Sequence, residues 1–268
     1  MSLAEITFMS GCLKRMVTFK ALIPNEKGFL PGEERSFSAE KFKSLYLLHG
    51  YSGDCSDYLL NTNISFLSAA NNLAVIFPSG ENSFYLEDVD KREDYSRFIG
   101  EELVFYTRSL FRLSERKEDT SIGGLSMGGY GAMINGLRYA DTFSGIISLS
   151  GAYIELGIAD EKKFLPDGIS DEKYQNRVFG VPDKLRYSDK DPRYCMEVLE
   201  EKKKDMPHIY LVCGEQDFLI EPNRKMHQFL AEKEIPHYYE EGEGVHNWAY
   251  WNKHLEASIT WLLGRKDI

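Results

Sequence analysis

The chain has 268 residues, 43% of them hydrophobic and 13% aromatic, so it can bury a full core without disulfides or a structural metal ion. Its formal net charge of -10 argues against nucleic acid or an anionic membrane as a partner, because both attract basic surfaces. The four cysteines form no CxxC pair, and there is neither a signal-like leader nor a run of about 18 apolar residues. We therefore expect one cytoplasmic domain, residues 1–268, with free thiols and neither a zinc site nor a disulfide framework.

Short apolar runs alternate with longer amphipathic segments along the chain, which is typical of strands joined by crossover helices. Helices are predicted at 56–72, 94–111, 127–140 and 247–264, and strands at 16–24, 44–50, 73–80, 120–126, 143–151, 208–214 and 236–242. Several of these strands are apolar on both faces, as buried parallel strands are. The pattern predicts an α/β fold with a mostly parallel central sheet and helices on both faces.

The helix predicted at 94–111 has a clear apolar stripe. Ile99, Leu103, Tyr106 and Leu110 recur at steps of four, three and four, so we expect all four to face the core.

Residues 152–206 form a long polar segment between two buried strands, with scattered aromatics and the cluster "EEKKKD". A connection of this length inside a compact domain is usually functional. We expect a small helical excursion that borders the active site and helps to form a substrate pocket. A solvated surface insertion is the alternative.

The stretch "GLSMG" at 124–128 matches the pattern G-x-S-x-G, between a predicted strand and a predicted helix. In that setting the serine occupies a strained turn that lifts its hydroxyl above the sheet. Gly124 and Gly128 remove side chains that would collide in the turn. Ser126 is therefore the candidate nucleophile.

A serine hydroxyl needs an activating base, and in this arrangement an acid and then a histidine follow the serine along the chain. His246 lies in the glycine-flanked loop "EGEGVHNW", just after the last predicted strand, and is the candidate base. A structural role for it is the alternative. The other downstream histidines begin strands or lie within helices: His208, His227, His237 and His254.

The acid is expected in the loop after the preceding buried strand, where a carboxylate can fix the histidine tautomer. Asp217 in "YLVCGEQDFLIEPN" is the candidate. Glu215 is its local competitor, and Asp189 and Asp191 are weaker alternatives.

Two backbone amides are also needed to stabilise an oxyanion. The amide of Met127, directly after the serine, is one candidate. Tyr51 in "LLHGYSGD" is the other, with Ser52 as its alternative. The candidates for an apolar pocket wall are Phe84, Tyr85 and Trp248, together with the side chain of Tyr51; a place in the core is the alternative for each.

The segments "LLHGYSGD", "GLSMGGYGA", "CGEQDFLIEPN" and "HNWAYW", in this order, resemble the esterase D family of α/β-hydrolases. The chain is most similar to the bacterial tributyrin esterase branch, which is related to S-formylglutathione hydrolases and to feruloyl and acetyl xylan esterases. The resemblance covers nearly the whole chain. It implies a triad of Ser126, Asp217 and His246, a main-chain oxyanion hole at Tyr51 and Met127, and a possible homo-oligomer. The segments 81–89 and 152–206 are not diagnostic of a subfamily.

From these residues we expect a serine carboxylesterase that hydrolyses short-chain acyl esters of small molecules through an acyl-enzyme, with no cofactor and no metal ion. One alternative is an S-formylglutathione hydrolase-type thioesterase or a feruloyl or acetyl xylan-type esterase. A more distant one is a non-catalytic α/β-hydrolase-like binding protein, which would typically lack one of the three triad residues.

Overall fold

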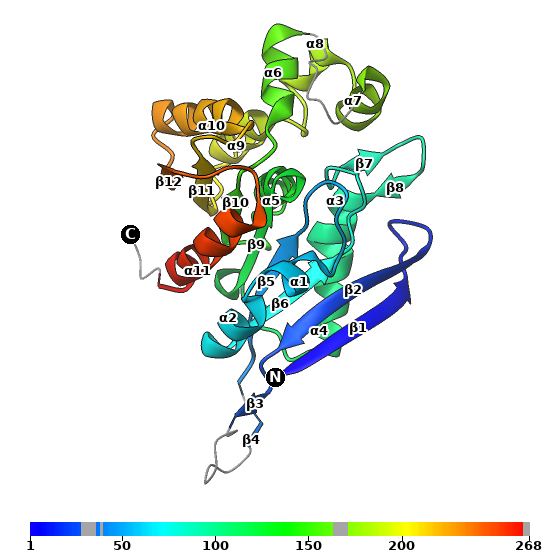
Figure 1. Cartoon of the computed structure of the whole chain (residues 1–268). Helices are drawn as coiled ribbons and strands as arrows, with labels where there is room; N and C mark the ends of the chain where they lie inside the picture. The colour runs from blue at the N-terminus through cyan, green and yellow to red at the C-terminus, as the bar shows by residue number, and fades with distance from the viewer. Residues whose placement is uncertain (28–35, 38–39, 163–170, 265–268) are drawn as a thin grey trace.

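A mostly parallel sheet of eight strands forms the centre of the molecule (Figure 1). The computed structural model describes residues 1–27, 36–37, 40–162 and 171–264. The strands lie in the order β1 (Ser2–Met9), β2 (Met16–Ile23), β6 (Leu73–Pro78), β5 (Lys43–Leu48), β9 (Thr120–Leu125), β10 (Gly145–Leu149), β11 (His208–Gly214) and β12 (His237–Gly242). Strands β6, β5, β9, β10, β11 and β12 are parallel to one another, whereas β2 is antiparallel to both β1 and β6.

Helices cover both faces of this sheet because successive residues of a strand point to opposite sides. On β5, Tyr46 and Leu48 belong to one buried cluster, and Leu45 and Leu47 belong to the other. The first cluster includes side chains of α4 (Leu103–Leu110), α5 (Met127–Arg138), α9 (Pro192–Glu201) and α10 (Ile220–Glu232). The second includes side chains of α1 (Asp57–Asn61), α2 (Ile64–Ala70) and α11 (Trp248–Gly264). The predicted fold class is confirmed.

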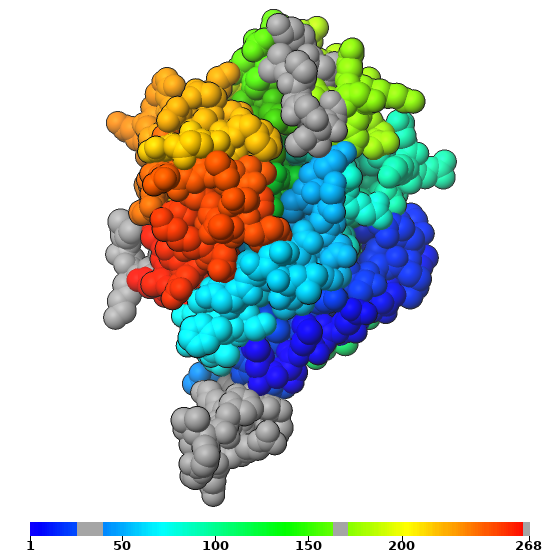
Figure 2. All heavy atoms as spheres, viewed as in Figure 1, coloured from blue at the N-terminus to red at the C-terminus, as the bar shows by residue number. Residues whose placement is uncertain are grey.

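Helix α11 packs beside α1 and α2, although these two helices are far from it in the sequence. The surfaces of α11 and of α1 and α2 adjoin in Figure 2, and the backbone N–H of Asn63 donates a hydrogen bond of 3.1 Å to the Asn252 side chain. The rings of Tyr58 and Trp248 meet edge to face with centroids 5.4 Å apart. The last element of the chain is therefore anchored against the loop region that follows β5.

Two predicted helices differ from the structure. The segment 56–72 forms two short helices, because Thr62 adopts an extended backbone and its hydroxyl donates a hydrogen bond of 2.6 Å to the Tyr58 carbonyl. The segment 94–111 is divided into α3 (Tyr95–Arg97), a π-helical turn η1 (Phe98–Glu102) and α4.

The predicted core stripe of this helix is wrong at its end. Ile99 and Leu103 are fully buried, but Leu110 is 48% exposed. A π turn holds more residues than an α turn, so it rotates the positions that follow it. After η1 the buried positions of α4 are Leu103, Val104 and Thr107.

The segment 152–206 carries α6 (Ile154–Glu161), α7 (Glu172–Phe179), α8 (Pro182–Leu185) and α9. Helix α7 approaches a small hairpin of β7 (Glu87–Asp88) and β8 (Glu93–Asp94), where Arg177 Nε lies 3.4 Å from Asp88 Oδ2 (Figure 1). The remaining elements are the short strands β3 (Glu26–Lys27) and β4 (Ser36–Phe37) and a 3₁₀ turn, η2 (Lys117–Asp119). That the 152–206 excursion borders an active site stays a prediction.

Within the described ranges, no helix is long and apolar enough to cross a membrane. Cys12, Cys55, Cys195 and Cys213 are free thiols.

Candidate active site

Ser126 occupies the turn between β9 and α5 in a strained conformation. Its φ of 54° and ψ of -121° lie in a region that side-chain-bearing residues rarely adopt. Three backbone hydrogen bonds of 2.9 Å hold it there: its amide donates to the Leu149 carbonyl, and its own carbonyl accepts from Gly129 and Ala152. The serine is thus fixed by the helix that follows it and by the end of the neighbouring strand β10.

The glycines on either side of this turn are required by close backbone contacts. A Cβ atom on Gly124 would lie 2.2 Å from the Gly128 carbonyl oxygen. A Cβ atom on Gly128 would lie 2.2 Å from the Leu48 carbonyl oxygen, at the end of β5. No side chain fits at either position, as the pattern G-x-S-x-G predicts.

Three loops at the carboxyl edge of the sheet bring Ser126, His246 and Asp217 into one hydrogen-bonded series. His246 Nε2 lies 3.0 Å from Ser126 Oγ, and His246 Nδ1 lies 3.0 Å and 2.8 Å from the two carboxylate oxygens of Asp217. Asp217 is 2% exposed and Ser126 is 9% exposed. The structure therefore brings together the three residues predicted as nucleophile, base and acid.

The alternatives to Asp217 lie elsewhere. Glu215 is exposed, Asp189 pairs with Arg138, and Asp191 pairs with Arg193 at the start of α9. The other histidines lie away from Ser126 as well: His227 and His237 contact each other, and His254 is buried within α11.

The protonation of this series follows from its surroundings. Burial raises the pKa of Asp217, but hydrogen bonds from His246 and from the Leu219 amide outweigh that effect and leave the pKa below its ordinary value. An ionised carboxylate only accepts hydrogen bonds, so Nδ1 of His246 carries the proton. Nε2 then presents its lone pair to the Ser126 hydroxyl, which is the arrangement that a general base needs.

The loop after β5 lies directly against this series. A Cβ atom on Gly50 would lie 3.5 Å from Ser126 Cβ, and the Gly53 amide closes the loop by donating to the Gly50 carbonyl over 3.2 Å. Met127 is the first residue of α5, so its amide has no acceptor within the helix. The segments that carry both predicted oxyanion donors, Tyr51 and Met127, thus flank Ser126.

Comparison with known proteins identifies the family. Residues 29–262 match the esterase family model described as "Putative esterase". An acetyl esterase of Caldicellulosiruptor saccharolyticus is 42% identical over 264 residues, which cover 98% of each chain. The chain belongs to the esterase family.

Solved structures agree with this assignment. A substrate-bound, fluorophosphonate-binding serine hydrolase of Staphylococcus aureus superposes with a TM-score of 0.83 at 26% identity, covering 99% of each chain. An S-formylglutathione hydrolase of the same organism gives 0.82 at 26% identity, covering 98% of each chain. The esterase has the α/β-hydrolase fold, and it is a carboxylic ester hydrolase rather than a non-catalytic binding protein.

In the esterase, the His49 side chain forms hydrogen bonds to two loops, the loop that follows β5 and the loop that contains Gly80. Its Nε2 accepts a hydrogen bond of 2.7 Å from the Gly80 amide, so Nδ1 carries the proton and donates to the Gly50 carbonyl, also over 2.7 Å. Burial lowers the pKa of His49, which keeps the ring neutral and able to make both bonds. No sequence pattern predicts this contact, because Gly80 lies 31 residues further along the chain.

Two of the predicted pocket residues of the esterase lie in its core. The Tyr85 side chain is fully buried, donates a hydrogen bond of 2.9 Å to the His49 carbonyl and packs beside Gly80 and Gly131. Phe84 is 5% exposed, with its ring against Tyr130 and Phe179. Both rings lie in the core, and Gly80 and Gly131 leave room there for the ring of Tyr85. A part for either residue in a substrate pocket stays a prediction. Trp248 is half-buried against Tyr58 and Trp251 and stays a candidate.

Phe218 is a candidate that sequence reasoning missed. Its ring centroid lies 4.5 Å from that of His246, and the residue is 58% exposed. Its position directly after Asp217 in the motif "GEQDF" was the available signal. The exposed ring of Phe218 therefore packs against His246, the candidate base.

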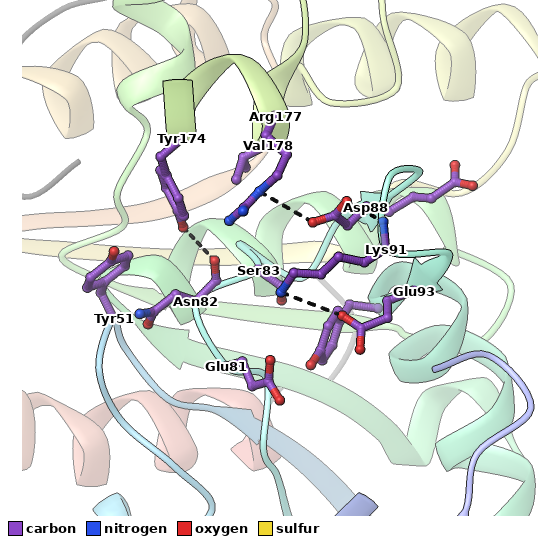
Figure 3. A pocket seen from close by; sticks show the side chains of 12 residues that line it. Tyr51, Glu81, Asn82, Ser83, Asp88, Lys91, Glu93, Tyr174, Arg177 and Val178 are labelled. Carbon is purple, nitrogen blue, oxygen red and sulfur yellow. Dashed lines mark hydrogen bonds and ion pairs between the residues drawn. The ribbon is translucent and has the colours of Figure 1, made fainter. Parts of the chain in front are cut away.

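A polar cavity of about 320 Å³ lies next to the loop after β5 (Figure 3). Tyr51, whose ring meets that of Tyr174 at 5.9 Å, forms one wall, and Glu81, Asn82, Asp88, Lys91 and Arg177 are among the other lining residues. The Tyr174 hydroxyl donates to the Asn82 carbonyl, and lining charges pair with one another, as Arg177 does with Asp88. The cavity shares only Tyr51 with the site described above.

Within the described residues, no group of three or more His, Cys, Asp or Glu side chains is placed to hold a metal ion.

Proposed function

We propose that this esterase is a serine carboxylesterase that hydrolyses short-chain acyl esters through an acyl-enzyme on Ser126. The observation that carries the proposal is the continuous hydrogen-bonded series from Asp217 through His246 to Ser126, with distances of 2.8 Å and 3.0 Å. Each residue type matches the role it would play: hydroxyl nucleophile, imidazole base and orienting carboxylate.

In the acylation step, Ser126 Oγ attacks the ester carbonyl carbon while its proton passes to His246 Nε2. The carbonyl oxygen becomes an oxyanion, which accepts hydrogen bonds from the amides of Tyr51 and Met127. When the carbon–oxygen bond to the alcohol breaks, that oxygen takes the proton from His246. The acyl group remains on Ser126.

In the deacylation step, a water molecule loses a proton to His246 and attacks the acyl carbon. The second tetrahedral intermediate collapses, Ser126 Oγ takes the proton back, and the carboxylic acid leaves. Asp217 remains an anion throughout and stabilises the imidazolium that forms twice in each turnover.

The preference for short acyl groups is supported by two observations. The relative from Caldicellulosiruptor saccharolyticus, 42% identical over nearly the full length, is an acetyl esterase. Ser126 is only 9% exposed, which favours a small acyl group at its hydroxyl. We therefore propose acetyl esters of small molecules as the substrate class.

A thioesterase acting on S-formylglutathione is the second candidate, because a hydrolase with that activity superposes over 98% of the chain. The chemistry at Ser126 would be the same, and only the leaving group would differ. Values of kcat/KM for S-formylglutathione and for acetyl, butyryl and hexanoyl esters of one alcohol separate the two: a thioesterase turns over the first far faster than any ester.

We also propose that the esterase is cytoplasmic and that it forms a homo-oligomer. The four free thiols support a reducing compartment.

The mechanism is tested with Ser126→Ala. We expect this variant to lose about four orders of magnitude in kcat on p-nitrophenyl acetate, because the nucleophile is absent. Its melting temperature should remain that of the wild type. A fluorophosphonate probe should label the wild type and leave the variant unlabelled. Ser109→Ala, on the exposed face of α4, is the matched control and should retain both activity and labelling. Normal turnover by Ser126→Ala would overturn the proposal.

A further inference from the structure

A hydrogen bond from the loop after β5 to the loop after β6 lies next to the candidate oxyanion donor. The Ser52 amide donates over 2.8 Å to the side-chain oxygen of Asn82. Ser52 directly follows Tyr51, so this bond lies one peptide away from the amide that is proposed to face the oxyanion. The Ser52 N–H already has an acceptor, which argues against Ser52 as the alternative oxyanion donor.

Ser52 has an unusual backbone conformation. Its φ is 65°, in the left-handed region that side-chain-bearing residues rarely adopt. Such a conformation persists where the surroundings hold it, often at a functional site. Ser52 is exposed, so burial in the core does not hold it, whereas the hydrogen bond to Asn82 does.

The Tyr51 amide belongs to a peptide that is held from its carbonyl side. The Gly50 carbonyl accepts hydrogen bonds of 2.7 Å from His49 Nδ1 and of 3.2 Å from the Gly53 amide. A peptide unit is planar and trans, so the N–H of Tyr51 points away from that carbonyl in a fixed direction. A Cβ atom on Gly50 would lie 3.5 Å from Ser126 Cβ, which puts this peptide beside the candidate nucleophile.

Asn82 is itself held by the helical excursion. The hydroxyl of Tyr174, on α7, donates to the Asn82 carbonyl oxygen (Figure 3). The ring of Tyr174 also meets the ring of Tyr51 edge to face, with centroids 5.9 Å apart. Tyr174 therefore contacts both Tyr51 and the residue that binds Ser52.

We infer that Asn82 is a positioning residue for the oxyanion hole. Its side chain holds Ser52, and through Ser52 the Tyr51 amide, in the geometry that an oxyanion needs, and Tyr174 holds Asn82 in turn. The inference rests on the proposed function, in which the Tyr51 amide is an oxyanion donor. The effect of Asn82 on the reaction passes through the peptide between Tyr51 and Ser52.

The physical reason lies in the backbone freedom of Ser52. Without the Asn82 oxygen, Ser52 can return to a negative φ, which is more favourable for an L-residue. That change rotates the peptide between Tyr51 and Ser52 and displaces Tyr51. A displaced amide stabilises the oxyanion of the transition state less well, while binding of the uncharged ester changes little.

The test compares Asn82→Leu, which has a similar shape but no acceptor, with Asn82→Asp, which keeps an oxygen at the same place. Asn82 is exposed, so both variants should melt like the wild type. We expect Asn82→Leu to lower kcat on p-nitrophenyl acetate roughly 3- to 10-fold with KM within about twofold, the effect of losing one hydrogen bond in the transition state. Asn82→Asp should stay within about twofold of the wild-type kcat, because it restores the acceptor.

Two further variants complete the comparison. Tyr174→Phe keeps the ring against Tyr51 and removes the hydroxyl that binds Asn82, so it should lower kcat by a smaller factor than Asn82→Leu, again with little change in KM. Asn176→Leu, at an exposed position of the same helix α7, is the matched control and should keep wild-type kinetics.

A second readout follows the oxyanion hole without turnover. In the proposed mechanism, Ser126 Oγ adds to the carbonyl carbon of a trifluoromethyl ketone, its proton passes to His246 Nε2, and the carbonyl oxygen becomes an oxyanion that stays bound. The inhibition constant of this ketone should rise in Asn82→Leu by the same factor by which kcat/KM falls, because the inhibitor and the transition state use the same amides. A folded variant with only a lower stability would bind the ketone as the wild type does.

The outcomes separate this inference from the proposed function. Full activity of Ser126→Ala would refute the proposed mechanism. If Ser126→Ala is inactive but Asn82→Leu keeps the wild-type kcat and inhibition constant, the mechanism stands and the positioning role is refuted. Equal losses in Asn82→Leu and Asn82→Asp would also refute that role, since the acceptor oxygen would then not be the group that matters. Should Asn82→Leu not fold, Asn82→Ala carries both readouts.

Discussion

His49 Nε2 accepts a hydrogen bond of 2.7 Å from the backbone N–H of Gly80, which lies 31 residues further along the chain. The other ring nitrogen donates to the Gly50 carbonyl, at the start of the loop that carries Tyr51. A single neutral imidazole therefore joins two loops, one of which is proposed to supply an oxyanion donor. We therefore expect the position of the Tyr51 amide to depend on the buried side chain of His49.

His49→Ala should weaken catalysis more than substrate binding. It leaves the buried Gly80 amide without its acceptor, which destabilises the fold by about 1–3 kcal/mol, and frees the loop that carries Tyr51. We expect kcat to fall roughly 10- to 100-fold while KM changes little, because an oxyanion donor acts mainly on the transition state. Steady-state kinetics beside a thermal melt measure both effects. Wild-type kcat in a folded variant would show that the loop does not need this support.

Gly128→Ala should disrupt the turn at Ser126. The new Cβ would lie 2.2 Å from the Leu48 carbonyl oxygen, a backbone atom that cannot move aside. We expect a loss of about 3 kcal/mol or more in the free energy of unfolding, at the upper end for overpacked sites. Urea denaturation provides the measurement. Gly264→Ala at the end of α11 is the control, since no atom lies within 4 Å of its added Cβ, and it should unfold like the wild type. Equal stability of the two variants would contradict the prediction.

Phe218→Ala should change the choice of leaving group. In the proposed mechanism His246 returns its proton to the departing alcohol, so the exposed ring of Phe218, 4.5 Å from the imidazole, is expected to face that alcohol. Loss of an aromatic contact of about 1–1.5 kcal/mol corresponds to roughly a 5- to 12-fold lower kcat/KM for phenyl acetate.

Ethyl acetate, which shares the acyl group, should be affected far less by Phe218→Ala. Phe105→Ala, also at an exposed position but on α4, is the control and should alter the turnover of neither substrate. A parallel drop for both esters would instead indicate that Phe218 only supports His246.

Glu155→Gln should make stability less dependent on pH. Glu155 on α6 is fully buried, and neither of its carboxyl oxygens has a hydrogen-bond partner. Burial, with a contribution from the charge of Asp191, raises the pKa of this carboxyl well above its ordinary value. The folded protein therefore keeps a proton that the unfolded chain loses at its ordinary pKa. As pH rises above that unfolded value, the native state binds more protons than the unfolded state, and the free energy of unfolding falls.

Glutamine is neutral in both states, so the advantage of Glu155→Gln over the wild type should be small near pH 4. It should grow above that pH by up to about 1.4 kcal/mol per pH unit. Thermal melts from pH 4 to pH 8 provide the measurement, and Glu201→Gln, exposed at the end of α9, should show no such trend. A pH-independent difference between Glu155→Gln and the wild type would contradict the argument.

The centre of the fold could be predicted from sequence because its strands are buried on both sides. Strands β5 and β6 appear as short apolar runs, and β9 and α5 are located by the glycine-rich turn around Ser126 that joins them. The candidate site could be predicted for a related reason: its residues lie at strand ends, and chain order limits which histidine and which acid can meet Ser126.

Other features depend on contacts that no local pattern contains. Strand β1 lies at the sheet edge and alternates between exposed and partly buried residues, so it lacks the apolar signal of its neighbours. The π turn within 94–111 directs Leu110 to solvent, and the single glycine inside it, Gly100, does not distinguish a π turn from a continuous α-helix. Tyr85 was expected at a pocket wall and is buried because Gly80 and Gly131, on two other segments, leave a space of its shape.

The separation of 120 residues between Ser126 and His246 has a consequence for protein synthesis. The strained turn and the helix behind it can form once the ribosome has released the chain through β10, but the imidazole arrives only with the loop before α11, the last helix of the fold. In the proposed mechanism, a chain that ends before this loop carries the candidate nucleophile without its candidate base, so we expect no hydrolysis until the loop before α11 is in place.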